Sequence, residues 1–369
     1  MKTEAIVTVI IWLVFLTAAL VAALIWARPR SKLHSTGLFD LRKNRAIILI
    51  TVAVTILFCI VPMGLCPIWN GQIPAHRNQY EVITESFLAG NLHFPYEPSE
   101  GLMQMENPYD PYARRDEGVP FRWDHAYYNG RYYMYFGVVP VLFAFLPYRV
   151  ITGTALTTYH ATQLFTAVFI AGLFAFFYQL AKKFFRDISL GMYLFLSVAF
   201  SAVSVWCAVS TPALYCTAIT AGMAAMVWGM YFWTKGVWDS RHRKQALLCA
   251  VAGSFLGALA FGCRPPIAMG NLVILALMFY YLKEHPWKNK WQDGLAFLSP
   301  YVVVGVLLML YNHARFGSVL EFGQSYQLTS VDGTNMPSLF NLPTVEQKLE
   351  LLRTYLKNAE RYLFQVTGR

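Results

Sequence analysis

AIVTVIIWLVFLTAALVAALIWA, residues 5–27, contains 23 residues and no charged side chain. A helix of about 20 apolar residues is long enough to cross the hydrocarbon core of a bilayer. Further apolar runs lie at 46–70, 158–181, 188–234, 246–263, 265–282 and 294–312. The run at 188–234 is too long for one helix, and Ser210-Thr211-Pro212 divides it because proline interrupts a helix. The sequence therefore predicts an all-α polytopic membrane protein with about eight transmembrane helices.

The composition supports this fold class. Hydrophobic residues make up 56% of the 369-residue chain and charged residues only 14%, against about 25% charged residues in a typical soluble domain. So few charges exclude a soluble enzyme, a disordered protein and a coiled coil. The net charge of +10 is spread over loops between the apolar runs. We therefore expect membrane lipids as partners and no nucleic acid.

The basic residues predict which loops face the cytoplasm. Four loops together hold 16 Lys and Arg residues, at 28–45, 182–187, 235–244 and 283–293. The short loops around Ser210 and Arg264 hold one. Because positively charged loops remain cytoplasmic, this distribution places the N-terminus outside. Segment 135–151 is short and contains two prolines. Counting it as a span would place the basic loop at 182–187 outside. We therefore expect this segment to lie at the membrane surface or to form a re-entrant segment.

The longest segment between predicted spans, 69–157, forms an outer loop rich in acidic and aromatic residues. Within it, 78–89 carries apolar residues at helical spacing, which predicts a short amphipathic helix ended by Gly90-Asn91. A second amphipathic helix is expected at 344–364, where leucines alternate with Glu and Lys.

The end of the outer loop reads FRWDHAYYNGRYYMYFG, residues 121–137. Asn129-Gly130 predicts a β-hairpin, because both residues of a type I′ turn have positive φ. The aromatic residues around the turn either anchor the loop at the lipid headgroups or stack on sugar rings, and both interpretations remain open. Asp124 lies beside this hairpin, as a general base or as an ordinary turn acid.

Two arginines lie at the outer ends of predicted spans. Arg264 separates two apolar runs, and Arg315 follows the last of them. The Arg264 guanidinium either binds a lipid phosphate in a bidentate manner or extends to the headgroups of ordinary lipids. Arg315, with Glu321 after it, belongs either to a loop that lines the substrate site or to a salt-bridged lid hinge. Both are therefore candidate substrate-binding residues.

Several strings, taken in order, resemble those of membrane glycosyltransferases of the GT-C fold, in particular the bacterial relatives of protein O-mannosyltransferases. They are Tyr80-Glu81 with SFLAGNL at 86–92, WDHAYYNGRYYMYFGVVP at 123–140, Leu146-Pro147, Gly262-Cys263-Arg264-Pro265, and ARFGS at 314–318 with Glu321-Phe322-Gly323. The resemblance begins near residue 46. It implies an added N-terminal anchor and basic cytoplasmic loop (1–45), a core (46–313) and an extracytoplasmic C-terminal segment (314–369). Such proteins usually have more spans, so we expect a truncated or partial chain.

The resemblance implies an enzyme of the bacterial plasma membrane that moves a sugar from a polyprenyl-phosphate carrier to a hydroxyl of an acceptor glycan, lipid or protein. The configuration of the anomeric carbon would be inverted. An acid of the outer loop would be the base. Many members carry it before the tyrosine, where this chain has HRNQ at 76–79. Our first choice is therefore Asp124, which lies next to the turn, and the second is Glu81.

In the same resemblance, arginines or a divalent metal hold the carrier phosphate, and no other cofactor is expected. Arg264 is the first candidate for the phosphate contact, followed by Arg131 and Arg315. The other substrate contacts are expected from five residues: Tyr80, Trp123, Tyr128, Asn129 and Tyr132.

Two other classes of function compete with this one. A transporter or flippase for a lipid-linked or polar solute would carry ionisable residues near the centres of its spans, whereas the charges of this chain lie at the ends of the apolar runs. A non-catalytic membrane protein would not need acidic and aromatic residues gathered in one outer loop.

Overall fold

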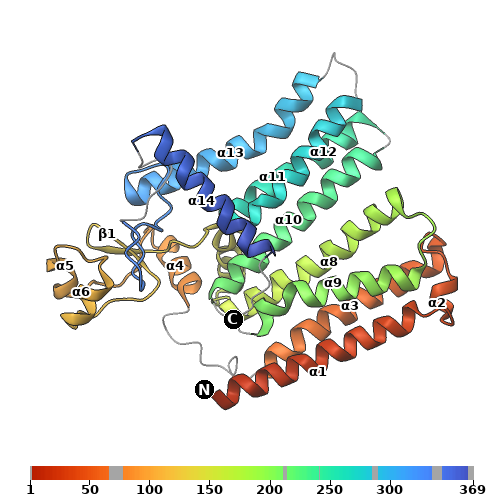
Figure 1. Ribbon diagram of the computed structural model, residues 1–369, viewed down its shortest axis with the longest axis horizontal. Helices are drawn as coiled ribbons and strands as arrows, with labels where there is room; N and C mark the ends of the chain where they lie inside the picture. Colours follow the sequence, from red (N-terminus) through yellow and green to blue (C-terminus); the bar gives the residue numbers. More distant parts are fainter. Residues whose placement is uncertain are drawn as a thin grey trace. The chain divides into compact units, whose positions relative to one another are not determined.

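The computed structural model describes residues 2–65, 78–210, 214–240, 242–284, 290–334 and 343–364. The described chain is mostly helical (Figure 1), and it divides into two compact units. Residues 1–94 and 136–320 form the first unit, and residues 95–135 and 321–369 form the second. Residues 95–135 of the expected outer loop (69–157) thus group with the C-terminal segment, and the described residues on either side of them group with the apolar helices.

The first unit contains the long apolar helices. They are α1 (Lys2–Ala27), α3 (Leu41–Leu65), α8 (Thr158–Phe184), α9 (Leu190–Ser210), α10 (Leu214–Trp238), α11 (Arg243–Cys263), α12 (Asn271–Glu284) and α13 (Lys290–Phe316). Among the described residues, seven helical segments are long and apolar enough to cross a membrane. The chain is therefore a multi-pass integral membrane protein. The eighth expected span forms α9, whose apolar stretch Leu190–Trp206 is shorter; the Thr211-Pro212 break that precedes α10 lies outside the described residues.

Small residues and interhelical hydrogen bonds join the helices of the first unit. The indole Nε1 of Trp233 in α10 donates to the Ser254 hydroxyl of α11 over 3.2 Å. The hydroxyls of Thr162 in α8 and Thr217 in α10 lie 2.8 Å apart. Lipid tails are as apolar as leucine, so helices in a bilayer associate through close packing and such polar contacts.

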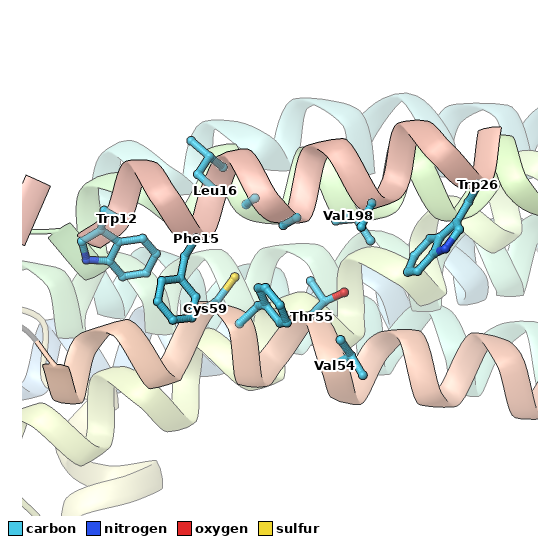
Figure 2. Close-up of a pocket in the computed structure, with 12 residues that line it drawn as sticks. Trp12, Phe15, Leu16, Trp26, Val54, Thr55, Cys59 and Val198 are labelled. Atoms are coloured by element: carbon cyan, nitrogen blue, oxygen red, sulfur yellow. The ribbon is translucent and has the colours of Figure 1, made fainter. Parts of the chain in front are cut away.

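Helix α1 is packed into the first unit. Figure 2 shows a pocket of about 100 Å³ lined by α1, α3 and α9, with Trp12 and Trp26 at its two ends and Phe15 and Cys59 between them. The Trp26 carbonyl oxygen would lie 2.3 Å from a Cβ on Gly191 of α9. The 1–45 segment, expected as an added anchor, therefore shares a core with the helices that follow it.

Five short helices of the described residues also belong to the first unit: α2 (Lys32–Ser35), α4 (Gln79–Leu88), the π-helix η3 (Val141–Phe145), α7 (Leu146–Thr152) and the 3-10 helix η4 (Pro265–Gly270). Helix α4 confirms the amphipathic helix predicted at 78–89, and Gly90 follows it with φ of 79°. Tyr80 and Ile83 of this helix are buried, whereas Leu88 is exposed. The apolar segment Val141–Thr152 is too short for a span, as expected.

The second unit contains α5 (Glu100–Gln104), α6 (Pro111–Asp116), β1 (Ala126–Tyr128), β2 (Arg131–Tyr133) and α14 (Val345–Phe364). The predicted hairpin is confirmed: Tyr127 pairs with Tyr132 in an antiparallel register. Asn129 and Gly130 have φ angles of 46° and 69°, as a type I′ turn requires. Helix α14 confirms the helix predicted at 344–364.

Candidate functional site

In the second unit, a segment near residue 327 pairs with the free edge of β1. Ala126 forms an antiparallel bridge with Gln327. The backbone N–H of Tyr127 donates to the Tyr326 carbonyl over 2.9 Å, and that of Leu328 donates to the His125 carbonyl over 2.9 Å. The C-terminal segment thus fixes the backbone just before the hairpin.

This pairing positions Asp124. Its backbone N–H donates to the Leu328 carbonyl over 3.1 Å, and its Oδ1 accepts a 2.8 Å hydrogen bond from Gln327 Nε2. Its φ is 59°, in the left-handed region that Asp and Asn tolerate better than other non-glycine residues. Only 9% of the residue is exposed. Asp124 is therefore a carboxylate held by the fold, in contrast to a solvated loop acid.

The neighbours of Asp124 are equally constrained. His125 is buried, and its Nδ1 donates to the Trp123 carbonyl over 2.9 Å. The imidazole lies edge-on to the rings of Tyr96 and Tyr132. The indole of Trp123, in contrast, is exposed. The chain therefore presents a fixed carboxylate beside an exposed aromatic face.

A tyrosine cluster lies next to this segment. The rings of Tyr128 and Tyr326 have centroids 4.6 Å apart, and the ring of Tyr109 lies 5.8 Å from that of Tyr326. The Tyr109 hydroxyl donates to the Tyr127 carbonyl over 2.8 Å. Burial raises the pKa of Tyr109 above its ordinary value, with neighbouring tyrosines adding to the effect, so the phenol remains a hydrogen-bond donor.

The hairpin separates the expected substrate contacts into two groups. Asn129 and Arg131 are exposed at the turn, and Tyr128 is half-buried beside them. Tyr132 is only 1% exposed, because it packs against Tyr127 and His125 in the interior of the unit. The structure thus leaves Tyr128, Asn129 and Arg131 accessible and gives Tyr132 a packing role.

Within the second unit, a buried arginine that the sequence analysis did not single out joins the segment near residue 108 to the segment near residue 329. Arg114 is 1% exposed and donates to the carbonyl oxygens of Pro108 and Thr329. Its guanidinium lies 4.6 Å from the ring centre of Phe121. The sequence analysis did not identify Arg114, Gln327 or Tyr326. The only sequence signal near the last two was the Glu321-Phe322-Gly323 string.

In the first unit, Gly137 lies against both Tyr80 and the end of α11. Its carbonyl accepts a 3.3 Å hydrogen bond from the Tyr80 hydroxyl, and Tyr80 stacks on Phe145 with centroids 5.2 Å apart. A Cβ at Gly137 would lie 2.1 Å from the Gly262 carbonyl oxygen and 2.2 Å from that of Cys263. Tyr80 is completely buried, which makes it a packing residue between α4 and the segment that contains Gly137 and η3.

Arg264 directly follows this junction. It is half-buried and extended, with φ of −157°, between α11 and η4. Within the described part of the chain, no ion pair or hydrogen bond engages its side chain. Phe261 and Ala268, on either side of it in the chain, line a crevice of about 400 Å³. In the same crevice, the Tyr301 hydroxyl donates to Asn271 over 2.7 Å.

Glu81 has a structural partner at the start of α8. Its Oε1 accepts a 2.7 Å hydrogen bond from the backbone N–H of Thr158, so the carboxylate caps that helix. Burial raises the pKa of Glu81 above its ordinary value, although the hydrogen bonds from Thr158 oppose this effect. One turn later, Glu85 pairs with Arg149 at 2.6 Å. Glu81 therefore joins α4 to α8.

We expect the stability of the protein to depend on pH through Glu81. Because the pKa of Glu81 is raised, the folded protein keeps its proton at pH values where the unfolded chain has lost it. The free energy of unfolding therefore falls as the pH rises from the ordinary pKa of glutamate to the raised value. Glu81→Gln should lose this dependence, which melting curves between about pH 4 and pH 8 would measure.

Glu85→Gln is the matched control for this prediction, because the Glu85 side chain is 49% exposed and lies on the same helix. It should keep the pH dependence of the wild type. An equal slope in the wild type and in Glu81→Gln would contradict the prediction.

Arg315 is buried at the end of α13. Its Nη2 donates to Asn312 Oδ1 over 2.8 Å, and its guanidinium lies 3.9 Å from the ring centre of Tyr311. A second ring, that of Phe316, lies 4.6 Å from it. With 5% of the residue exposed, Arg315 fixes the end of this helix and offers little surface to a ligand.

The structure thus assigns Asp124 and Arg131 to the second unit, and Glu81, Arg264 and Arg315 to the first. In the described part of the chain, no three His, Cys, Asp or Glu side chains gather closely enough to hold a metal ion. Comparison with protein-family models, curated proteins and solved structures gives no match to this chain.

Proposed function

We propose that the chain is a membrane glycosyltransferase that moves a sugar from a polyprenyl-phosphate carrier to an acceptor hydroxyl. It would act on the outer face of the bacterial plasma membrane, with the N-terminus outside. The observation that carries this proposal is the Asp124 carboxylate, which is buried, held by Gln327 and adjacent to the exposed Trp123. A positioned carboxylate can take a proton from a hydroxyl, and aromatic faces bind sugar rings.

The proposed reaction is a single displacement at the anomeric carbon. The acceptor oxygen forms the new glycosidic bond while its proton passes to the Asp124 carboxylate. The bond from the anomeric carbon to the carrier phosphate breaks, and the phosphate leaves with the bonding electrons. Attack opposite to the leaving group inverts the configuration.

Arg264 supports the donor side of the proposal. Its guanidinium matches the geometry of a phosphate and retains its charge in an apolar environment. The crevice lined by Phe261 and Ala268 is apolar apart from a few groups such as Asn271 and Tyr301, which suits a lipid chain. These features support a role for Arg264 in binding the phosphate of the carrier.

Replacing Arg264 by alanine should weaken binding of the donor. A hydrogen bond to a charged group contributes about 1.5–3 kcal/mol, so we expect the KM for the donor to rise about 10- to 100-fold. Arg264→Lys should recover part of the loss, because lysine keeps the charge but not the bidentate geometry. Initial rates at varied donor concentration measure both variants, and an unchanged donor KM in Arg264→Ala would remove this assignment.

The proposal is tested in proteoliposomes that contain the purified protein, a radiolabelled polyprenyl-phosphate sugar and an extract of the bacterial envelope as acceptor. A transferase moves the label from the solvent-extractable lipid to the acceptor fraction. A transporter or flippase leaves the label on the lipid and changes only its leaflet. Label that stays on the lipid with every sugar tried, while the protein remains folded, would contradict the proposal.

A further inference from the structure

Helix α14 carries an exposed apolar stripe. Val345, Leu349, Leu352 and Leu356 follow one another at intervals of four, three and four residues, so they share one face of the helix. Their exposed fractions are 74%, 51%, 43% and 64%. A stripe of large apolar side chains on a surface helix indicates a binding surface.

The charges of α14 lie on the two flanks of this stripe. At 100° per residue, Glu346, Glu350, Arg353 and Lys357 lie on one side of it, about 70° to 130° from its centre, and Lys348 lies about 70° away on the other side. Of the four residues on the first side, the two acids precede the two bases in the chain. Tyr355, which is 49% exposed, lies about 90° from the centre of the stripe, on the same side as Lys348.

We propose that α14 binds the surface of the bilayer in which the same chain is embedded. Its apolar face would enter the boundary between headgroups and acyl chains, and Arg353 and Lys357 would face anionic headgroups. An exposed apolar stripe with bases on both flanks and a tyrosine nearby is typical of interfacial helices.

The chain itself keeps α14 near a bilayer. Helix α13 ends at Phe316 and α14 begins at Val345. The 28 residues between them reach at most about 100 Å when fully extended. The effective concentration of membrane surface at α14 is therefore high. This inference does not depend on the proposed sugar transfer.

Photocrosslinking in nanodiscs tests the proposal on the full chain. p-Benzoylphenylalanine replaces Leu352 in one variant and Leu356 in a second, and Thr354 on the opposite face is the matched control. In nanodiscs of phosphatidylglycerol and phosphatidylcholine, positions 352 and 356 should give about fivefold more lipid adduct than position 354. Intact-mass measurement identifies lipid adducts, peptide mapping identifies crosslinks within the chain, and denaturing gels identify crosslinked dimers.

Each other result overturns the proposal, provided that the variants melt like the wild type. Crosslinks from 352 and 356 to another segment would show that the chain covers its own stripe, and crosslinked dimers would show a second copy. Equal lipid labelling at all three positions, or no adduct at any, would show that the stripe does not face lipid. The pair Arg353→Gln and Lys357→Gln should lower the adduct yield only when phosphatidylglycerol is present, and an unchanged yield would remove the role of these bases.

Discussion

Asp124→Asn should slow sugar transfer about 10²- to 10⁴-fold, the usual contribution of a general base. Asparagine tolerates the left-handed backbone that residue 124 adopts, with φ of 59°. Its side-chain oxygen can also accept the hydrogen bond that Gln327 now donates to Asp124. The variant therefore removes the negative charge and leaves the local structure in place.

The matched control for this prediction is Asp116→Asn. Asp116 belongs to the same unit, and its side chain is 70% exposed. It should transfer sugar at the rate of the wild type. Initial rates at saturating donor, measured with melting curves for all three proteins, decide the outcome. If Asp124→Asn folds and retains the wild-type rate, Asp124 is not the base.

Gly137→Ala should prevent stable folding of the first unit. The added Cβ would lie 2.1 Å and 2.2 Å from the carbonyl oxygens of Gly262 and Cys263, and backbone atoms cannot move aside as a flexible side chain can. Overpacking usually costs 1–3 kcal/mol, and we expect at least about 3 kcal/mol for a clash with two backbone groups. The junction that holds Tyr80 and precedes Arg264 would be displaced.

The comparison for this prediction is Gly305→Ala. Gly305 lies in α13, and a Cβ there has no atom within 4 Å in the described part of the chain. Alanine also favours a helix more than glycine does. The yield of monodisperse protein and the melting temperature in detergent measure both variants. Equal stability of Gly137→Ala and Gly305→Ala would contradict the close approach at Gly137.

The sequence predicted the parts of the fold that depend on neighbouring residues. Apolar runs of sufficient length predicted the long helices, Asn129-Gly130 predicted the hairpin, and helical spacing predicted α4 and α14. In each case the deciding interactions are local, so composition and periodicity contain them.

The contacts around the candidate residues were not predictable, because they join distant parts of the chain. Gln327 lies 203 positions from Asp124, and no periodicity links the two. The hairpin could be predicted, but not which of its faces would be buried. Alternation places Tyr127 and Tyr132 on one face and Tyr128 with Arg131 on the other, and only the structure shows that the first pair is the buried one.

The same limit applies to the candidate acids and to Tyr80. The sequence showed Glu81 and Asp124 as two acids of one outer loop. The structure gives Glu81 a capping contact with Thr158 and gives Asp124 a left-handed backbone with a side-chain donor. Tyr80, expected as a substrate contact, is completely buried. Burial and partners, which sequence patterns do not contain, separate such residues.

The anomeric configuration of the product tests the central claim most directly. The protein would be supplied with a polyprenyl-phosphate sugar of known anomeric configuration, and the new linkage would be analysed by nuclear magnetic resonance. A direct displacement assisted by a carboxylate predicts a glycosidic bond of the opposite configuration. A product that retains the donor's configuration, or the lack of any new glycosidic bond with folded protein, would contradict it.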